Sequence, residues 1–142
     1  MNNAIYILDT DHLSLYGRNH PQVIANLRAN LQLIATTVIN VEEQLKGRLA
    51  QVAEAKTKDG GALTNAYQRL IETMLLLSEF RVLQYNADSW AIYQSLKVQR
   101  IRVGTQDLRI ASITLAHNGV LVTRNLQDFK QVPNLTIQDW SI

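Results

Sequence analysis

The 142-residue sequence contains no cysteine, which excludes disulfide bonds, thiolate zinc sites and cysteine nucleophiles. This absence is compatible with a reducing cytoplasm, where we expect the protein to act. No apolar run approaches the roughly 20 residues that a membrane-spanning helix needs. The sequence does not begin with a basic segment followed by a long apolar one, so we expect no signal peptide. These absences predict a soluble protein with no membrane partner.

The composition is that of a folded globular protein. Hydrophobic residues make up 46% of the chain and charged residues 18%, unlike an intrinsically disordered sequence. The length suits one core, and we find no internal repeat, so we expect a single domain over residues 1–142. The net charge of +2 is uninformative, although residues 85–142 carry six basic and four acidic side chains. That excess weakly indicates a surface facing a polyanion, with an ordinary solvated surface as the alternative.

Short apolar segments alternate with helical patterns along the whole chain. We expect strands at 4–8, 33–38, 81–83, 120–122 and 135–137. We expect helices at 11–16, from 21 onward, and at 40–56, 62–78, 87–98, 108–117 and 125–129. Because this alternation implies parallel strands joined by right-handed crossovers, the predicted fold class is α/β, a three-layer α/β/α domain with a small central parallel sheet.

Some local details of these helices are also predicted. Asn40 is expected to open one helix, and Thr105 and Asn125 to cap two others. Residues 56–61, charged and then glycine-rich, are expected to form a loop between two helices. The helix at 87–98 is expected to turn inward the side chains of Trp90, Ala91 and Leu96.

Acidic residues follow several strands or begin the helices behind them. Asp9 directly follows the first strand, and the other candidates are Glu43 (or its neighbour Glu42), Asp107 and Asp128. Because the carboxyl ends of parallel strands share one edge of a sheet, where ligands bind in such folds, we expect these acids to meet there.

Carboxylates gathered in this way suit a hard divalent cation. Mg²⁺ prefers oxygen ligands and keeps several waters, so a few carboxylates suffice. Without a cation the crowded acids would repel one another, and at least one pKa would rise. A cation there can lower the pKa of a bound water and offset charge on a phosphate, which predicts phosphodiester hydrolysis without a His, Cys or Ser nucleophile.

Most of these acids also have an ordinary structural interpretation. Glu43 lies three residues after Asn40, the spacing of a capping box, and Asp128 lies three residues after Asn125. Asp107 falls in a first helical turn, where the helix dipole favours acids. Taken singly, each of these three is better explained by a structural role than by catalysis, and only Asp9, directly after an apolar strand, favours function by itself.

Other polar side chains near the expected edge are weaker candidates. Thr10 and Thr123 follow strands and can orient a carboxylate or a water, or be plain turn residues. Arg102 and Arg124 flank the edge and can hold phosphate, although such arginines are more often solvated. The histidines have no metal-ligand spacing, and we expect surface or packing roles for His12, His20 and His117.

Four segments occur in a characteristic order: 7–14 (ILDTDHLS), 37–47 (TVINVEEQLKG), 104–111 (GTQDLRIA) and 121–129 (LVTRNLQDF), continuing to 132–135 (VPNL). In this order they resemble PIN-domain ribonucleases, specifically the VapC-type toxins of type II toxin–antitoxin systems. The resemblance covers essentially the whole chain. It implies a PIN fold, endoribonuclease activity on RNA with Mg²⁺ or Mn²⁺ as cofactor, a homodimer, and an antitoxin partner whose tail blocks the active site.

The resemblance also assigns roles to residues. Asp9 matches the family's first metal-site aspartate, Glu43 matches the helix glutamate better than Glu42 does, and Asp107 matches the third acid. The fourth position stays open. Many members have an Asp where this chain has Asn125 and a second acid where it has Asp128, so either residue can complete the site.

Two alternatives stand beside this hypothesis. The Asn at position 125 also suits a catalytically lapsed module that only binds RNA or an antitoxin. A haloacid-dehalogenase-like phosphatase is suggested by Asp9-Thr10-Asp11 after a strand. However, Leu13 stands where that motif has Thr or Val, and a late paired-acid segment is missing.

Overall fold

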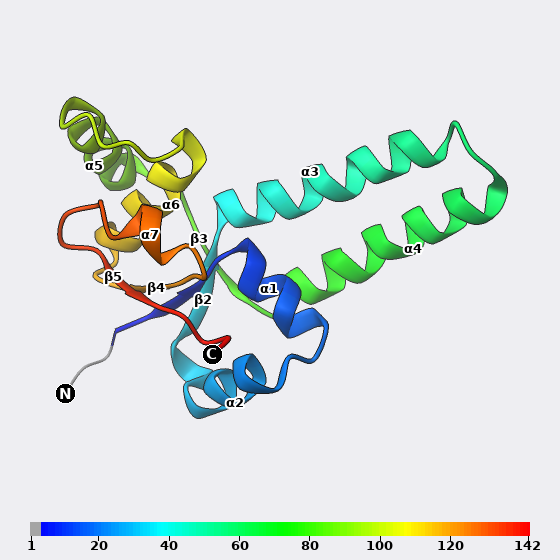
Figure 1. Cartoon of the computed structure of the whole chain (residues 1–142), viewed down its shortest axis with the longest axis horizontal. Helices are drawn as coiled ribbons and strands as arrows, with labels where there is room; N and C mark the ends of the chain where they lie inside the picture. Colours follow the sequence, from blue (N-terminus) through cyan, green and yellow to red (C-terminus); the bar gives the residue numbers. More distant parts are fainter. Residues whose placement is uncertain (1–3) are drawn as a thin grey trace.

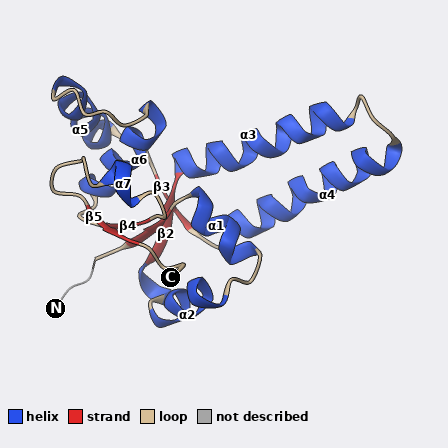
Figure 2. Ribbon diagram, viewed as in Figure 1, coloured by secondary structure: helices blue, strands red, loops and turns tan. Residues whose placement is uncertain are grey.

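The computed structural model describes residues 4–142, and its centre is a sheet of five parallel strands (Figure 2). The strands are β1 (Tyr6–Leu8), β2 (Ile34–Thr37), β3 (Arg81–Leu83), β4 (Val120–Val122) and β5 (Thr136–Gln138). Their order is β3-β2-β1-β4-β5, and every neighbouring pair is parallel. The expected strands are confirmed, and β5 lies at an edge as predicted.

Helices cover both faces of this sheet. They are α1 (Thr10–Gly17), α2 (Pro21–Ala29), α3 (Val38–Ala55), α4 (Gly60–Leu77), α5 (Ala87–Val98), α6 (Thr105–Ala116) and α7 (Leu126–Phe129), with a 3-10 turn at Leu31–Leu33. Successive strand residues point to opposite faces, so Ile7 packs with α5 and α6 while Leu8 packs with α1 and α2. This alternation creates two apolar cores and confirms the three-layer α/β/α fold.

The helices α3 and α4 form an antiparallel hairpin that extends away from the sheet (Figure 1). Near its tip the hairpin has a small apolar cluster of its own, formed by Val52, Ala55 and Ala66. On the outer surface of α4, Ile71, Met74 and Leu75 remain 56% to 64% exposed. No helix within residues 4–142 combines the length and the apolar character needed to cross a membrane.

Several local predictions are wrong at the helix ends. Helix α3 begins at Val38 and is capped by Thr37, whose hydroxyl accepts the backbone N–H of Asn40 at 3.1 Å. Gly60 and Gly61 lie in the first turn of α4, not in a loop, because Asp59 caps that helix. Thr105 is the first residue of α6, and the cap position belongs to Gly104 without a side-chain bond.

The inward face of α5 also differs from the prediction. Leu96 is buried as expected, but Ala91 is exposed and Trp90 is 51% exposed. Trp90 instead stacks on Tyr93 with ring centroids 5.8 Å apart. The buried ring on this helix is therefore Tyr93, which reaches the core that Trp90 was expected to fill.

Candidate active site

A hollow of about 240 Å³ lies where β1, β2 and β4 end and the helices that follow them begin. Its polar lining residues are Asp9, Thr10, Asp11, Asn40, Glu43, Asp107 and Asn125. These residues come from separate stretches of the chain. The parallel topology brings them together because it places the carboxyl ends of neighbouring strands at one edge.

Asp9 is held rigidly at the end of β1. Its backbone N–H donates to the carbonyl oxygen of Val122 at 3.1 Å, which fixes it against β4. Its carboxylate caps α1, with Oδ1 accepting the backbone N–H of His12 at 3.0 Å. The residue is only 8% exposed, so its carboxylate has little freedom to reorient.

His12 is the residue that sequence reasoning missed. Its side chain is fully buried, and Nδ1 lies 3.2 Å from Oδ1 of Asp9. The backbone N–H of Trp140 donates to Nε2 at 3.2 Å, so Nε2 is an acceptor and the proton belongs on Nδ1, directed at Asp9. Beyond the expected surface or packing role, His12 therefore contacts a site carboxylate directly. The three-residue spacing from Asp9 on α1 was the available signal.

Glu43 belongs to a chain of hydrogen bonds between α1 and α3. It accepts the hydroxyl of Thr10 at 2.8 Å, and that hydroxyl in turn accepts the side-chain amide of Asn40 at 3.1 Å. The Asn40–Glu43 capping box predicted as the structural alternative is therefore not formed, since Thr37 caps the helix. Glu42 is exposed and accepts Gln106 at 2.8 Å, outside the hollow.

Asp107, at the start of α6, has the most perturbed carboxyl group of the site. Burial raises its pKa, and the nearby charges of Glu43, Asp128, Asp9 and Asp11 raise it further, to about 6. This is the repulsion among gathered acids that the sequence predicts. Half-buried and surrounded by like charges, Asp107 holds a proton far more readily than an ordinary aspartate.

Asn125 and Asp128 make contact with each other. Asn125 lines the hollow, and its side-chain amide donates to Oδ2 of Asp128 at 3.0 Å. Asn125 occupies the cap position of α7, but its side chain makes no capping bond there. Asp128 does not line the hollow, but its negative charge helps to raise the pKa of Asp107.

Of the weaker candidates, the two threonines lie close to the site residues and the two arginines do not. Thr10 lines the hollow, while Thr123 is buried and accepts the backbone N–H of Asn125 at 3.0 Å. Arg102 and Arg124 are exposed and lie outside the lining of the hollow. The threonines therefore orient site residues, whereas the two arginines do not reach them.

The donor set suits a divalent cation, although the side chains are not gathered around one point. Within residues 4–142, no three His, Asp or Glu side chains are close enough together to ligate one ion directly. Mg²⁺ needs only one or two carboxylates and retains its waters. The raised pKa of Asp107 marks a concentration of negative charge that a cation would relieve. The residues present therefore fit a partly hydrated Mg²⁺ or Mn²⁺.

The comparisons with known proteins agree with this fold. Ribonuclease VapC2 of Rickettsia felis is 30% identical over 143 residues, covering 96% of this chain and 98% of the relative. The crystal structure of VapBC2 from Rickettsia felis, bound to a DNA fragment from its promoter, matches with a TM-score of 0.75, 27% identity and 96% and 98% coverage. VapBC-1 from nontypeable Haemophilus influenzae matches with a TM-score of 0.72, 28% identity and 97% and 99% coverage.

No protein-family model matches the chain. The three-layer fold and the acid-lined sheet edge nevertheless define a PIN-type nuclease domain. Within that class, this chain belongs to the VapC ribonucleases, the toxin components of VapBC toxin–antitoxin systems.

Proposed function

We propose that this chain is a metal-dependent endoribonuclease that hydrolyses RNA phosphodiesters with Mg²⁺ or Mn²⁺, as the toxin of a VapBC-like pair. One observation carries the proposal. Asp9, Glu43 and Asp107 line one hollow although they are far apart in sequence, and burial together with the neighbouring acids raises the pKa of Asp107 to about 6.

Each polar group has a distinct task in this proposal. Asp9, Glu43 and Asp107 hold the cation, and Asn125 or Asp128 completes the site. When bound, the cation supplies a more acidic water and offsets the negative charge of the scissile phosphate. His12 orients the carboxylate of Asp9, and Thr10 orients that of Glu43. Because the pKa of Asp107 is raised to about 6, this carboxyl would have to be deprotonated to hold the cation.

The test is cleavage of a defined single-stranded RNA by the purified protein. We expect cleavage with Mg²⁺ or Mn²⁺, none with EDTA, and none with Asp9→Asn. Asp88→Asn is the matched control, because Asp88 is an exposed first-turn aspartate on α5 and should leave cleavage unchanged. A folded protein that neither cleaves RNA nor binds either metal would support the alternative, a lapsed RNA- or antitoxin-binding module.

We infer the partners from the solved relatives and from the family resemblance. Two of them are VapBC complexes, so we infer a protein antitoxin for this chain. The family resemblance further leads us to propose a homodimeric toxin that acts in the cytoplasm. Co-expression with the product of an adjacent gene should give a complex that purifies together and no longer cleaves RNA. Sedimentation of the toxin alone tests the homodimer.

A further inference from the structure

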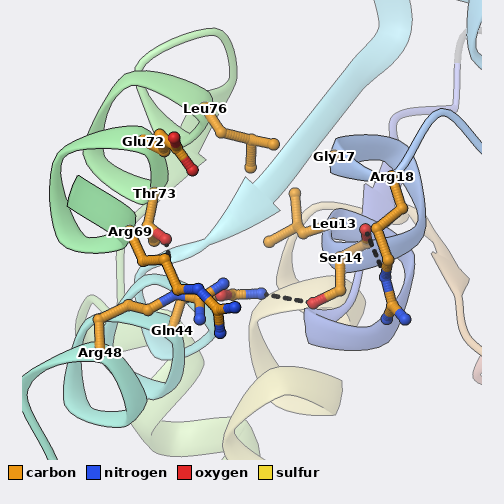
Figure 3. Close-up of a pocket in the computed structure, with 10 residues that line it drawn as sticks. All are labelled: Leu13, Ser14, Gly17, Arg18, Gln44, Arg48, Arg69, Glu72, Thr73 and Leu76. Atoms are coloured by element: carbon orange, nitrogen blue, oxygen red, sulfur yellow. Dashed lines mark hydrogen bonds between the residues drawn. The ribbon is translucent and has the colours of Figure 1, made fainter. Parts of the chain in front are cut away.

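A second and larger hollow, of about 440 Å³, lies beside the first, between α1, α3 and α4 (Figure 3). Arginines dominate its polar lining. Arg48 of α3 and Arg69 of α4 lie on one side in Figure 3, and Arg18, which follows α1, lies on the other. Leu13 and Leu76 supply apolar lining between the helices.

These arginines outnumber the one carboxylate that lines the hollow, and within residues 4–142 none of them is paired with an acid. In the part of the chain that the structure describes, none of the three lies within 4.0 Å of an acidic group. The contacts there between basic and acidic side chains are His12–Asp9, His12–Asp139 and Lys58–Glu54. Glu72, which also lines the hollow, accepts the side chain of Gln68 at 3.1 Å.

Neutral acceptors hold Arg48 in place. Its Nε donates to the hydroxyl of Thr73 at 2.8 Å, and its Nη1 donates to Oε1 of Gln51 at 3.0 Å. Thr73 is buried, so one edge of the guanidinium is anchored to α4. Arg48 is thus positioned in advance, and its positive charge remains available to a ligand.

The side chain of Gln44 joins the arginine-lined hollow to the active site. Gln44 Nε2 donates to the carbonyl oxygen of Thr10 at 3.2 Å and lies 3.1 Å from the hydroxyl of Ser14. Gln44 follows Glu43 in α3, and Arg48 lies one turn further, about 6 Å along the helix axis. An RNA strand that lies across the acidic hollow would therefore reach these arginines within a short distance.

We propose that this hollow binds the RNA backbone phosphate of a nucleotide next to the scissile bond. The inference rests on the proposed ribonuclease activity and adds a substrate subsite to it. The acidic hollow repels a polyanion, so productive binding needs positive charge close by. The guanidinium fork suits phosphate oxygens in shape and charge, and three such groups surround this space.

The experiment measures RNA affinity separately from cleavage. A fluorescent single-stranded RNA is titrated in EDTA with the unaltered protein, with Arg48→Gln/Arg69→Gln, and with Arg28→Gln/Arg81→Gln. The last variant removes the same charge from exposed positions outside the hollow. We expect the hollow variant to bind about 10- to 100-fold more weakly. Its plot of log affinity against log salt should become shallower by about 0.7 for each phosphate that the variant no longer neutralises.

The control should change affinity much less, and thermal unfolding should show that both variants are folded. Equal losses of affinity in the two variants, or no RNA binding by the unaltered protein, would overturn the proposal. So would a hollow variant that keeps its RNA affinity but no longer binds its protein partner, because the arginines would then bind an acidic protein segment. Cleavage of the same RNA by the unaltered protein with metal tests the proposed function separately.

Discussion

Asp9 and His12 are joined twice, through the backbone N–H of His12 at 3.0 Å and through its Nδ1 at 3.2 Å, and both contacts use Oδ1 of the aspartate. The other ring nitrogen accepts the backbone N–H of Trp140, 128 residues away in sequence. One buried imidazole therefore connects the first site carboxylate to the end of the chain. Trp140 in turn packs against Tyr6 in β1, and the centroids of the two rings are 5.3 Å apart.

Replacing His12 should impair the site. We expect His12→Phe to lower kcat/KM by about 10- to 100-fold and to raise the Mg²⁺ concentration that gives half-maximal activity, because Asp9 keeps the backbone donor of residue 12 but loses the side-chain donor. His12→Asn, whose amide can still donate to Asp9, should recover part of this loss. The measurement is the dependence of activity on Mg²⁺ concentration for both variants and the unaltered protein. Equal curves for all three would contradict the proposal that His12 orients Asp9.

The neighbours Glu42 and Glu43 should behave very differently. Glu43→Gln removes a charged oxygen from the acidic hollow, and we expect kcat/KM to fall about 100-fold or more. Glu42→Gln alters only an exposed bond to Gln106 and should stay within about twofold. Steady-state cleavage of one RNA by both variants makes the comparison, and a larger loss for Glu42→Gln would reverse the assignment.

Asp107 should make the stability of the metal-free protein depend on pH. Its pKa is raised from 3.8 to about 6 in the folded chain, so between these values the folded state binds a proton that the unfolded state has released. Its contribution to the free energy of unfolding is therefore greatest below pH 3.8 and declines as pH rises towards about 6. Asp107→Asn should remove this decline and raise the unfolding temperature at neutral pH in EDTA.

The metal response supplies the complementary measurement. Because a cation needs the deprotonated carboxylate, Mg²⁺ affinity of the unaltered protein should rise with pH through about 6. Thermal unfolding measured across pH, with and without Mg²⁺, reports both the stability of the metal-free protein and its Mg²⁺ affinity. An unfolding temperature of Asp107→Asn that matches the unaltered protein at every pH in EDTA would contradict the charge crowding.

Two glycines should respond in opposite directions to alanine. A Cβ at Gly119 would lie 2.9 Å from Cδ1 of Ile7 and 3.0 Å from the carbonyl oxygen of Ile5, so Gly119→Ala should lower the free energy of unfolding by about 1–3 kcal/mol. Gly47 lies inside α3 with nothing within 4 Å of a Cβ, so Gly47→Ala should raise it by about 0.5–1 kcal/mol. Urea unfolding of both variants checks the signs.

The positions of strands and helices were accessible from sequence because their patterns are local. The bounds of α5 and β4 match the prediction, since apolar runs and capping residues lie within a few positions of the elements they define. The choice of caps was less accessible. Both Thr37 and Asn40 are suitable caps, and the end of β2 decided for Thr37 by bringing it to the start of α3.

The meeting of Asp9, Glu43 and Asp107 was predictable without any contact information, because parallel strands place their carboxyl ends at one edge. The sequence by itself thus determined the fold class, the family resemblance and the acids at that edge. Only the tertiary structure decided that His12 and Trp140 meet at Asp9, and that Arg18, Arg48 and Arg69 surround one hollow. Such meetings depend on how helices pack across long sequence separations, whereas the periodicity that marks a helix or strand describes only that element.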